Sequence, residues 1–234
     1  MTAKSTWTPM IADAYAKRYG EVAQDFLSLV VEPSLAALEL RRAEIAAQPD
    51  QIVAAFHLYD HYHLMTKTSM ALCLGIQSLW EQQLREYLGN CGSRVHLNSS
   101  TRSNIKGANW GVSGRFPSLN QLFVEIRGLE LENFTSYKRL EKLQLLGNVC
   151  RHGEGGSAVK LRANYPELWP SCEADSLRSV DGMLISTFLL RDLVNAVVLF
   201  WLDMDIACTE ALIPNNPAMI EEVARLRALR PALL

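Results

Sequence analysis

The sequence predicts an all-α fold, a helical bundle of long antiparallel helices connected by two long loops. Apolar residues recur at three- and four-residue steps along most of the 234 residues, as they do on helices with one buried face. No convincing alternation of apolar and polar residues, which would mark a strand, interrupts these segments. Prolines and glycines fall between the periodic stretches and divide the chain into successive helices.

The N-terminal region is expected to form two helices, over residues 10–31 and 34–47. Pro33 separates them, because proline lacks the backbone N–H that a helix interior requires. We expect residues 1–48 to form an N-terminal helical extension and residues 49–234 to form the bundle itself.

A long helix is expected next, over residues 51–89. Pro49 and Asp50 precede it, as is common at the start of a helix. Gly89 and Asn90 follow its last apolar residue and tolerate the left-handed turn that ends many helices. A single helix therefore accounts for a large part of the first half of the chain.

The remaining helices are shorter and follow recognisable capping and breaking residues. They are expected over residues 119–129, with Ser118 as the cap, and over residues 136–152, 180–211 and 218–229. The two long loops lie at residues 91–117 and 153–176. Loops of this length are uncommon in a compact domain and are often functional.

Composition excludes some classes of function. The chain has 23 Lys and Arg against 25 Asp and Glu, so a formal charge of −2 gives no overall attraction to nucleic acid or membranes. Five widely spaced cysteines include no C-x-x-C pair, which argues against a disulfide framework and against a zinc knuckle. The cysteine pattern and the absence of an apolar signal segment at the N-terminus together lead us to expect a cytoplasmic protein.

One apolar segment could be mistaken for a membrane span. Residues 183–202 are mostly apolar, but Arg191, Asp192 and Asn195 lie near the middle. A charge facing lipid at that depth costs about 3 kcal/mol. We therefore expect a buried bundle helix or an oligomer interface and no membrane contact.

A polar cluster marks the end of the helix expected over residues 136–152. Asn148 and His152 are four residues apart and share one helix face, with Arg151 beside them and Gly153 as the stop. A histidine in the last turn also complements the helix dipole, and Asn148 could simply cap a turn. The same three side chains could instead hold a phosphate or transfer a proton.

Glu81 also allows two interpretations. Arg85 lies four residues later, so the two could form a solvated ion pair on the helix surface. If Glu81 turned inward, it would need a cation, and Arg151 and Arg191 are candidates.

The first long loop carries basic residues and no acidic residue. Its cations and its tryptophan are candidates for attracting phosphate and stacking a base: Arg94, Arg102, Lys106, Arg115 and Trp110. Four positive charges over this length are also compatible with an ordinary solvated loop.

His57 and His61 have the spacing with which two imidazoles on a helix can share a metal ion. The metalloprotease pattern would place a glutamate base after the first histidine, where this chain has Leu58. No third ligand follows at a suitable spacing, so we expect neither a metal site nor a cofactor. Motifs of nucleotide hydrolases, Rossmann enzymes and serine hydrolases are absent.

Two segments resemble the HEPN superfamily (higher eukaryotes and prokaryotes nucleotide-binding domains). They are LCLGIQSLWEQQLREYL at residues 72–88 and LEKLQLLGNVCRHGEG at residues 140–155. The run Asn148-x-x-Arg151-His152-Gly153-x-Gly155 is similar to an Asn-x-x-(Lys/Arg)-His-Gly run of uncharacterised bacterial members. The resemblance extends over about residues 50–210 and implies an all-α bundle.

The resemblance also implies a function. Many HEPN proteins are metal-independent ribonucleases, toxins of toxin–antitoxin pairs or effectors of antiviral defence, and two motifs meet across a dimer to make one site. By position, His152 would be the general acid/base and Asn148 the polar residue after the motif arginine. This chain departs from the family at that arginine, since Gly147 occupies its position.

Two hypotheses follow. In the first, the chain belongs to a bacterial defence or toxin–antitoxin system and binds or cleaves RNA by attack of a 2′-hydroxyl on the adjacent phosphate. His152 would move the proton, Arg151 would stabilise the phosphate, Asn148 would orient one of them, and Glu81 would position Arg151. In the second, the chain is a catalytically inactive HEPN-like module for dimerisation or partner binding. A homodimer is expected in both, with RNA, an antitoxin or a defence protein as the further partner.

Overall fold

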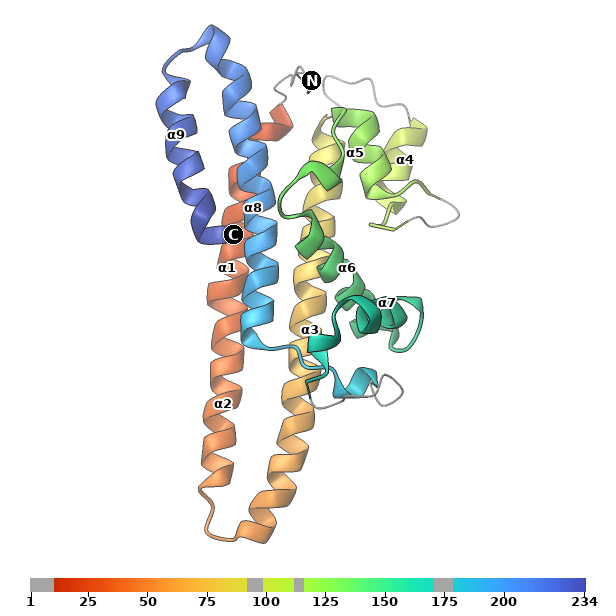
Figure 1. The fold of residues 1–234 in the computed structure, drawn as a ribbon, viewed down its shortest axis with the longest axis vertical. Coiled ribbons are helices and arrows are strands. Elements are labelled where there is room, and N and C mark those ends of the chain that lie inside the picture. The colour runs from red at the N-terminus through yellow and green to blue at the C-terminus, as the bar shows by residue number, and fades with distance from the viewer. Residues whose placement is uncertain (1–10, 92–98, 112–115, 171–178) are drawn as a thin grey trace. The chain divides into compact units, whose positions relative to one another are not determined.

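The structure is a computed structural model that describes residues 11–91, 99–111, 116–170 and 179–234 (Figure 1). These residues form helices and their connections, and none of them forms a β-strand. The predicted all-α helical bundle is therefore confirmed.

The chain forms two compact units, each assembled from separate stretches of sequence. Unit 1 contains the described residues up to 24 together with residues 79–140 and 195–234. Unit 2 contains residues 25–78 and 141–194. The helices α3, α6 and α8 each contribute to both units, and the N-terminal helices are shared between them.

The N-terminal helices follow one another without a break. A 3-10 turn (Ile11–Tyr15) leads into α1 (Ala16–Phe26), a π-helical turn (Leu27–Val31) and α2 (Glu32–Ala46). In the π turn, the Glu32 N–H donates to the carbonyl oxygen of Leu27, five residues earlier. We attribute the wider turn to the proline at position 33, which cannot donate, so that the helix changes its bonding pattern here where a break was predicted.

The long helix α3 spans Gln51–Asn90, as the sequence predicts. Asp50 caps it, since its Oδ1 accepts hydrogen bonds from the N–H groups of Ile52 and Val53, at 3.0 and 3.1 Å. Helix α5 (Leu119–Arg127) begins with the predicted Ser118 cap, which forms a reciprocal capping box with the residue at its third position.

The two predicted long loops both contain a helix, so this part of the prediction was wrong. Helix α4 (Ser99–Gly107) lies in the first and α7 (Gly156–Asn164) in the second. Each has nine residues and few buried side chains, for example Ile105 in α4. A helix this short carries too few apolar positions to establish a period in the sequence.

The remaining helices are α6 (Tyr137–His152), α8 (Thr187–Leu212) and α9 (Met219–Leu229). Helix α8 begins later than predicted, because residues 180–182 form a separate 3-10 turn. Ser186 sets its start, since its Oγ accepts a hydrogen bond from the Leu189 N–H at 3.1 Å.

Aromatic side chains form the core of unit 1. Trp80 packs edge-on against Phe200 with ring centroids 4.7 Å apart, and Tyr87 packs against Trp201 at 5.5 Å. The Trp201 indole N–H donates to Gln83 Oε1 at 2.8 Å, which satisfies the polar atom of this buried ring.

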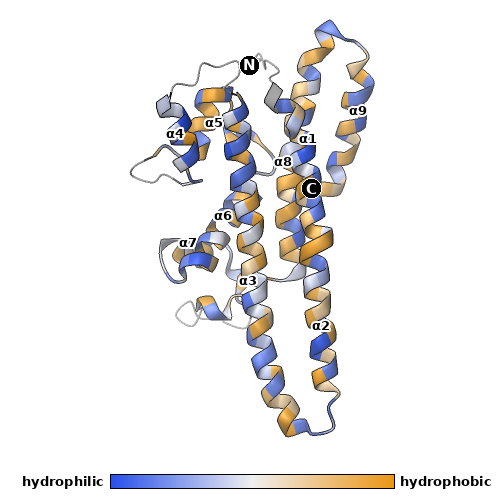
Figure 2. Cartoon of the chain, turned by 180° about the vertical axis from the view of Figure 1, so that it is seen from behind, coloured by the Kyte–Doolittle hydropathy of each residue, from blue (hydrophilic) through white to orange (hydrophobic). Residues whose placement is uncertain are grey.

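Unit 2 contains the α2–α3 hairpin, in which the two helices lie side by side (Figure 1). The buried imidazole of His61 bonds across the hairpin, its Nε2 lying 2.8 Å from the carbonyl oxygen of Leu38. Hydrophobic residues continue along α3 as far as the turn of the hairpin (Figure 2). Within the described residues, no helix has the length and apolar character needed to cross a membrane.

Candidate functional site

The predicted cluster lies at the end of α6, in unit 2. The helix ends because Gly153 adopts the left-handed φ of 70° and donates its N–H to the carbonyl oxygen of Val149 at 2.8 Å. Asn148 is half-buried, whereas Arg151 and His152 are both exposed. The structure therefore brings the three residues to one helix end without enclosing them.

Asn148 links α6 to α7. Its Nδ2 donates to Ser157 Oγ at 3.4 Å, and its Oδ1 accepts from Gln144 Nε2 at 3.4 Å. In the described part of the chain, the side chains of Arg151 and His152 take part in no hydrogen bond or ion pair. These two side chains are thus available to solvent or to a bound molecule, while Asn148 serves the contact between helices.

Gly147 makes a close contact between α6 and α3. A Cβ atom at this position would lie 2.5 Å from Cδ of Gln77, well inside van der Waals contact. The side chain of Gln77 lies against α6 here, and its Nε2 donates a hydrogen bond to Gln144 Oε1 at 2.8 Å. The position at which the HEPN motif has arginine is therefore occupied by a buried contact between two helices.

Glu81 lies in unit 1, where its Oε2 accepts a hydrogen bond from Arg85 Nη2 at 2.7 Å. Arg85 also donates from Nε to the carbonyl oxygen of Ala108 at 2.8 Å. The predicted pair with Arg85 is present, but Glu81 is buried and not solvated. Arg191, the other cation considered for Glu81, donates to Glu32 Oε1 at 2.6 Å. A role for Glu81 in positioning Arg151 stays a prediction.

The predicted RNA-binding residues that the structure describes lie in different environments. Arg102 and Lys106 lie on α4 and line a pocket of about 520 Å³ together with Arg85 and Glu86. Trp110 is only 9 % exposed, because its ring stacks on Tyr137 at 5.7 Å. This tryptophan belongs to the core of unit 1 and presents no open face for a base.

Two further predicted RNA-binding residues, Arg94 and Arg115, lie outside the described residues.

The two histidines with metal-ligand spacing are engaged by the protein. His57 Nδ1 lies 3.2 Å from Gln48 Oε1, and His61 Nε2 bonds to a backbone carbonyl. Among the described residues, no group of three or more His, Cys, Asp or Glu side chains is arranged to hold a metal ion.

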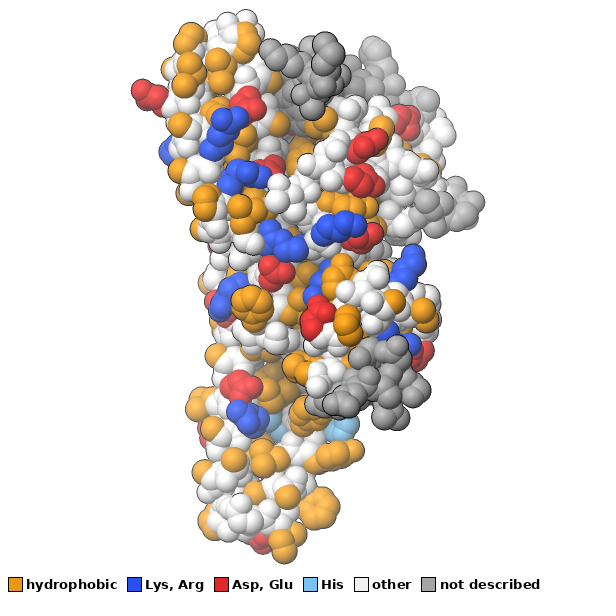
Figure 3. Space-filling model, in the orientation of Figure 1, with side chains coloured by type: hydrophobic (Ala, Val, Ile, Leu, Met, Phe, Trp, Pro, Cys, Tyr) orange, Lys and Arg blue, Asp and Glu red, His pale blue; other side chains and the backbone are white. Residues whose placement is uncertain are grey.

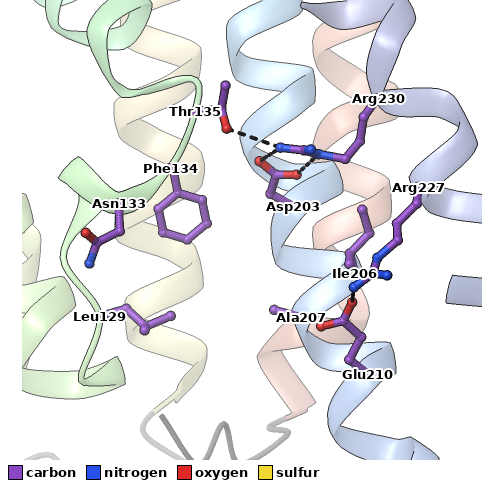
Figure 4. Close-up of a pocket in the computed structure, with 10 residues that line it drawn as sticks. All are labelled: Leu129, Asn133, Phe134, Thr135, Asp203, Ile206, Ala207, Glu210, Arg227 and Arg230. Atoms are coloured by element: carbon purple, nitrogen blue, oxygen red, sulfur yellow. Dashed lines mark hydrogen bonds and ion pairs between the residues drawn. The ribbon is translucent and has the colours of Figure 1, made fainter. Parts of the chain in front are cut away.

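Sequence reasoning gave no indication of a pocket of about 560 Å³ in unit 1, beside α8 and α9 (Figure 4). Arg230 donates to both carboxylate oxygens of Asp203, at 2.6 and 3.2 Å, and to Thr135 Oγ1 at 3.2 Å. The bonded carboxylate raises the pKa of Arg230. Arg227 pairs with Glu210 in the same pocket. Since each guanidinium already faces a carboxylate, these pairs hold α9 against α8 and offer little net charge to a ligand.

Comparisons with known proteins add no family assignment. No family model matches this sequence, and neither a curated protein nor a solved structure matches it. The likeness to HEPN proteins therefore remains a resemblance of short segments.

Proposed function

We propose that this chain is a non-catalytic, HEPN-like interaction module that assembles with a second copy of itself through the tip of α3. The α3 tip is defined here as residues 51–64, the part of α3 next to the turn of the hairpin. The observation that carries the proposal is the amount of apolar surface that this segment leaves in solvent.

The outward face of the α3 tip is apolar. Ala54 and His61 are buried toward α2. Ile52, Phe56 and Tyr59 follow one another at steps of four and three residues on the opposite face, and all are exposed. An apolar face of a helix is normally buried against another element. The outer face therefore lacks a covering element within unit 2.

The exposed area is large enough for an interface. Phe56, Tyr59 and Tyr62 are 70 %, 65 % and 56 % exposed. Since an aromatic side chain covers about 150–250 Å², these three leave roughly 300–500 Å² in solvent. The exposed aliphatic residues of the tip, Ile52, Val53 and Leu64, bring the total toward the low end of specific interfaces, which bury about 1,200 Å² over both partners. Figure 3 shows hydrophobic side chains gathered over this end of the hairpin.

The chemistry of the tip favours a second copy as the partner. Asp60 is the only Asp, Glu, Lys or Arg within residues 51–64, so the surface selects no partner of opposite charge. Steps of four and three residues are the spacing of a coiled-coil seam, which pairs well with itself. In an antiparallel pair related by a two-fold axis, Phe56 meets Tyr59 of the second copy, and no like charges face each other.

The packing of Gly147 supports a role without catalysis. Cleavage of RNA without a metal needs a cation at the phosphate, and the family supplies it from this position. An arginine here would have to displace Gln77 from between α3 and α6. The contact thus favours a bundle in which the motif position serves packing.

Light scattering on the purified chain tests the proposed assembly. Wild type is expected to be a dimer at tens of micromolar, and Phe56→Glu is expected to be a monomer with unchanged circular dichroism. Phe188→Glu is the matched control, because Phe188 lies in the same unit and is 77 % exposed. This control should remain a dimer. A monomeric wild type, or dissociation by Phe188→Glu alone, would contradict the proposed interface.

The second candidate function is a metal-independent ribonuclease of a defence or toxin–antitoxin system. The exposure of Arg151 and His152, with no partner for either in the described residues, favours this alternative. The test is incubation with total RNA and a tRNA panel in EDTA, beside an Arg151→Ala/His152→Ala variant. Intact RNA with both proteins supports the non-catalytic module. Cleavage by wild type alone, with 2′,3′-cyclic phosphate ends, would replace it with the ribonuclease.

A further inference from the structure

Two cysteines face each other between α3 and α6, inside unit 2. Cys73 lies four residues before Gln77 on α3, and Cys150 lies three residues after Gly147 on α6. Because the two helices run antiparallel and approach closely at Gln77 and Gly147, the next turn places the thiols together. A hydrogen bond joins Cys73 to Cys150.

The surroundings of the two thiols differ. Cys73 is completely buried, whereas Cys150 is half-buried and reaches solvent. Their hydrogen bond is the main reason that the pKa of Cys73 lies well above its ordinary value and that the pKa of Cys150 is lowered. The Lys67 ammonium also favours the Cys150 thiolate. A half-buried thiol with a lowered pKa beside a buried thiol is the usual arrangement of a reactive and a resolving cysteine.

We propose that Cys73 and Cys150 are a redox modification site, which hydrogen peroxide converts to a disulfide between α3 and α6. The Cys150 thiolate attacks one peroxide oxygen and breaks the O–O bond. This forms a sulfenic acid, and the other oxygen leaves as water after taking up a proton. The Cys73 thiol then attacks the Cys150 sulfur, the S–S bond forms, and the hydroxyl leaves with the Cys73 proton as a second water. Two thiols are thus oxidised by two electrons while one peroxide is reduced.

The other described cysteines lack these features. Burial raises the pKa of Cys91 and of Cys208 to about 11, so both remain protonated near neutral pH and react slowly. Both also lie in unit 1, apart from the pair. They provide internal controls for reactivity. The Cys73–Cys150 pair lies on α3 and α6 alone, away from the α3 tip, so its oxidation does not depend on dimerisation.

Peptide mapping tests the linkage directly. The folded full-length chain is treated with hydrogen peroxide, blocked with an alkylating reagent and digested with trypsin. We expect residues 68–85, which carry Cys73, to be joined to residues 143–151, which carry Cys150. A reducing dithiol should separate them. Joining of residues 143–151 to the peptide that carries Cys172, or to a second copy of itself, would overturn the proposal.

Single variants separate the two roles. In Cys73→Ser, Cys150 should remain as a sulfenic acid that dimedone traps, because the resolving thiol is gone. In Cys150→Ser, Cys73 should stay reduced at the same peroxide dose. Cys208→Ser should form the disulfide as wild type does. Oxidation of Cys73 in the Cys150→Ser variant, or no trapping in Cys73→Ser, would contradict the assigned roles.

Discussion

Gln77 of α3 lies directly across Gly147 of α6, so that a Cβ atom at position 147 would require the Gln77 side chain to move. The contact is buried and is held by the hydrogen bond from Gln77 Nε2 to Gln144. It links the sequence to the proposed function, because the same position carries arginine in the family that this chain resembles. Substitutions at this contact therefore report on both packing and function.

Gly147→Ala should destabilise the protein. Alanine favours a helix over glycine by about 1 kcal/mol, but a Cβ here overlaps Gln77, and overpacking a core costs about 1–3 kcal/mol. We expect a net loss of about 1 kcal/mol in the free energy of unfolding, measured by urea denaturation. Gln77→Ala in the same chain should recover part of this loss.

Gly89→Ala is the matched control for that substitution. Gly89 is a helical glycine as well, in α3, and a Cβ there would meet nothing within 4 Å. This variant should be neutral or more stable by up to about 1 kcal/mol. Equal gains in stability for the two variants would show that helix propensity decides, and not the contact with Gln77.

A buried ion pair joins the start of the chain to α5 in unit 1. Asp13 Oδ2 lies 3.2 Å from Arg127 Nη2, and the Tyr87 hydroxyl donates to Asp13 Oδ1 at 2.8 Å. Asp13→Ala should cost about 3–5 kcal/mol, because it removes the carboxylate from beside a buried guanidinium. Glu222→Ala, which breaks the exposed pair with Arg225, should leave stability almost unchanged. Chemical denaturation of both variants measures the difference, and similar losses would contradict this account of unit 1.

Asp205 should make stability fall as pH rises above the ordinary range of an aspartate. Burial is the main cause that raises the pKa of Asp205 in the folded chain, and the nearby Glu222 adds to it. The folded state therefore holds this proton more tightly than the unfolded state, so ionisation opposes folding once pH exceeds the unfolded pKa of about 4.

Asp205→Asn tests this dependence. The variant should melt at a higher temperature than wild type at pH 7, and the advantage should shrink toward pH 3, where wild type is protonated. Thermal scans across this range measure it. An advantage that is the same at every pH would mean that the carboxyl charge is not its cause.

Much of the fold is predictable from local sequence signals. The bounds of α3, α5, α6 and α9 follow from caps, glycines and apolar spacing within each segment. The two helices inside the predicted loops were missed because they are short and amphipathic only in part. The predicted break at Pro33 is also absent, because a π turn keeps the helix continuous at this position.

The candidate site was less predictable, because its features depend on contacts between distant segments. Asn148, Arg151 and His152 do lie at a helix end, as their spacing indicates. The meaning of Gly147 depends on Gln77, and the burial of Trp110 depends on Tyr137, and neither partner is adjacent in sequence. The pairing of Cys73 with Cys150 could not be predicted from cysteine spacing either, because the two residues are far apart in the sequence.

Amide hydrogen exchange of residues 51–64 tests the central claim most directly. The proposed dimer covers the outer face of the α3 tip, and a covered helix opens less often than an exposed one at the end of a hairpin. We expect these amides to exchange slowly in wild type at tens of micromolar and much faster in Phe56→Glu, with the rest of α3 unchanged. Equal exchange of this segment in the two proteins would contradict the claim that a second copy covers it.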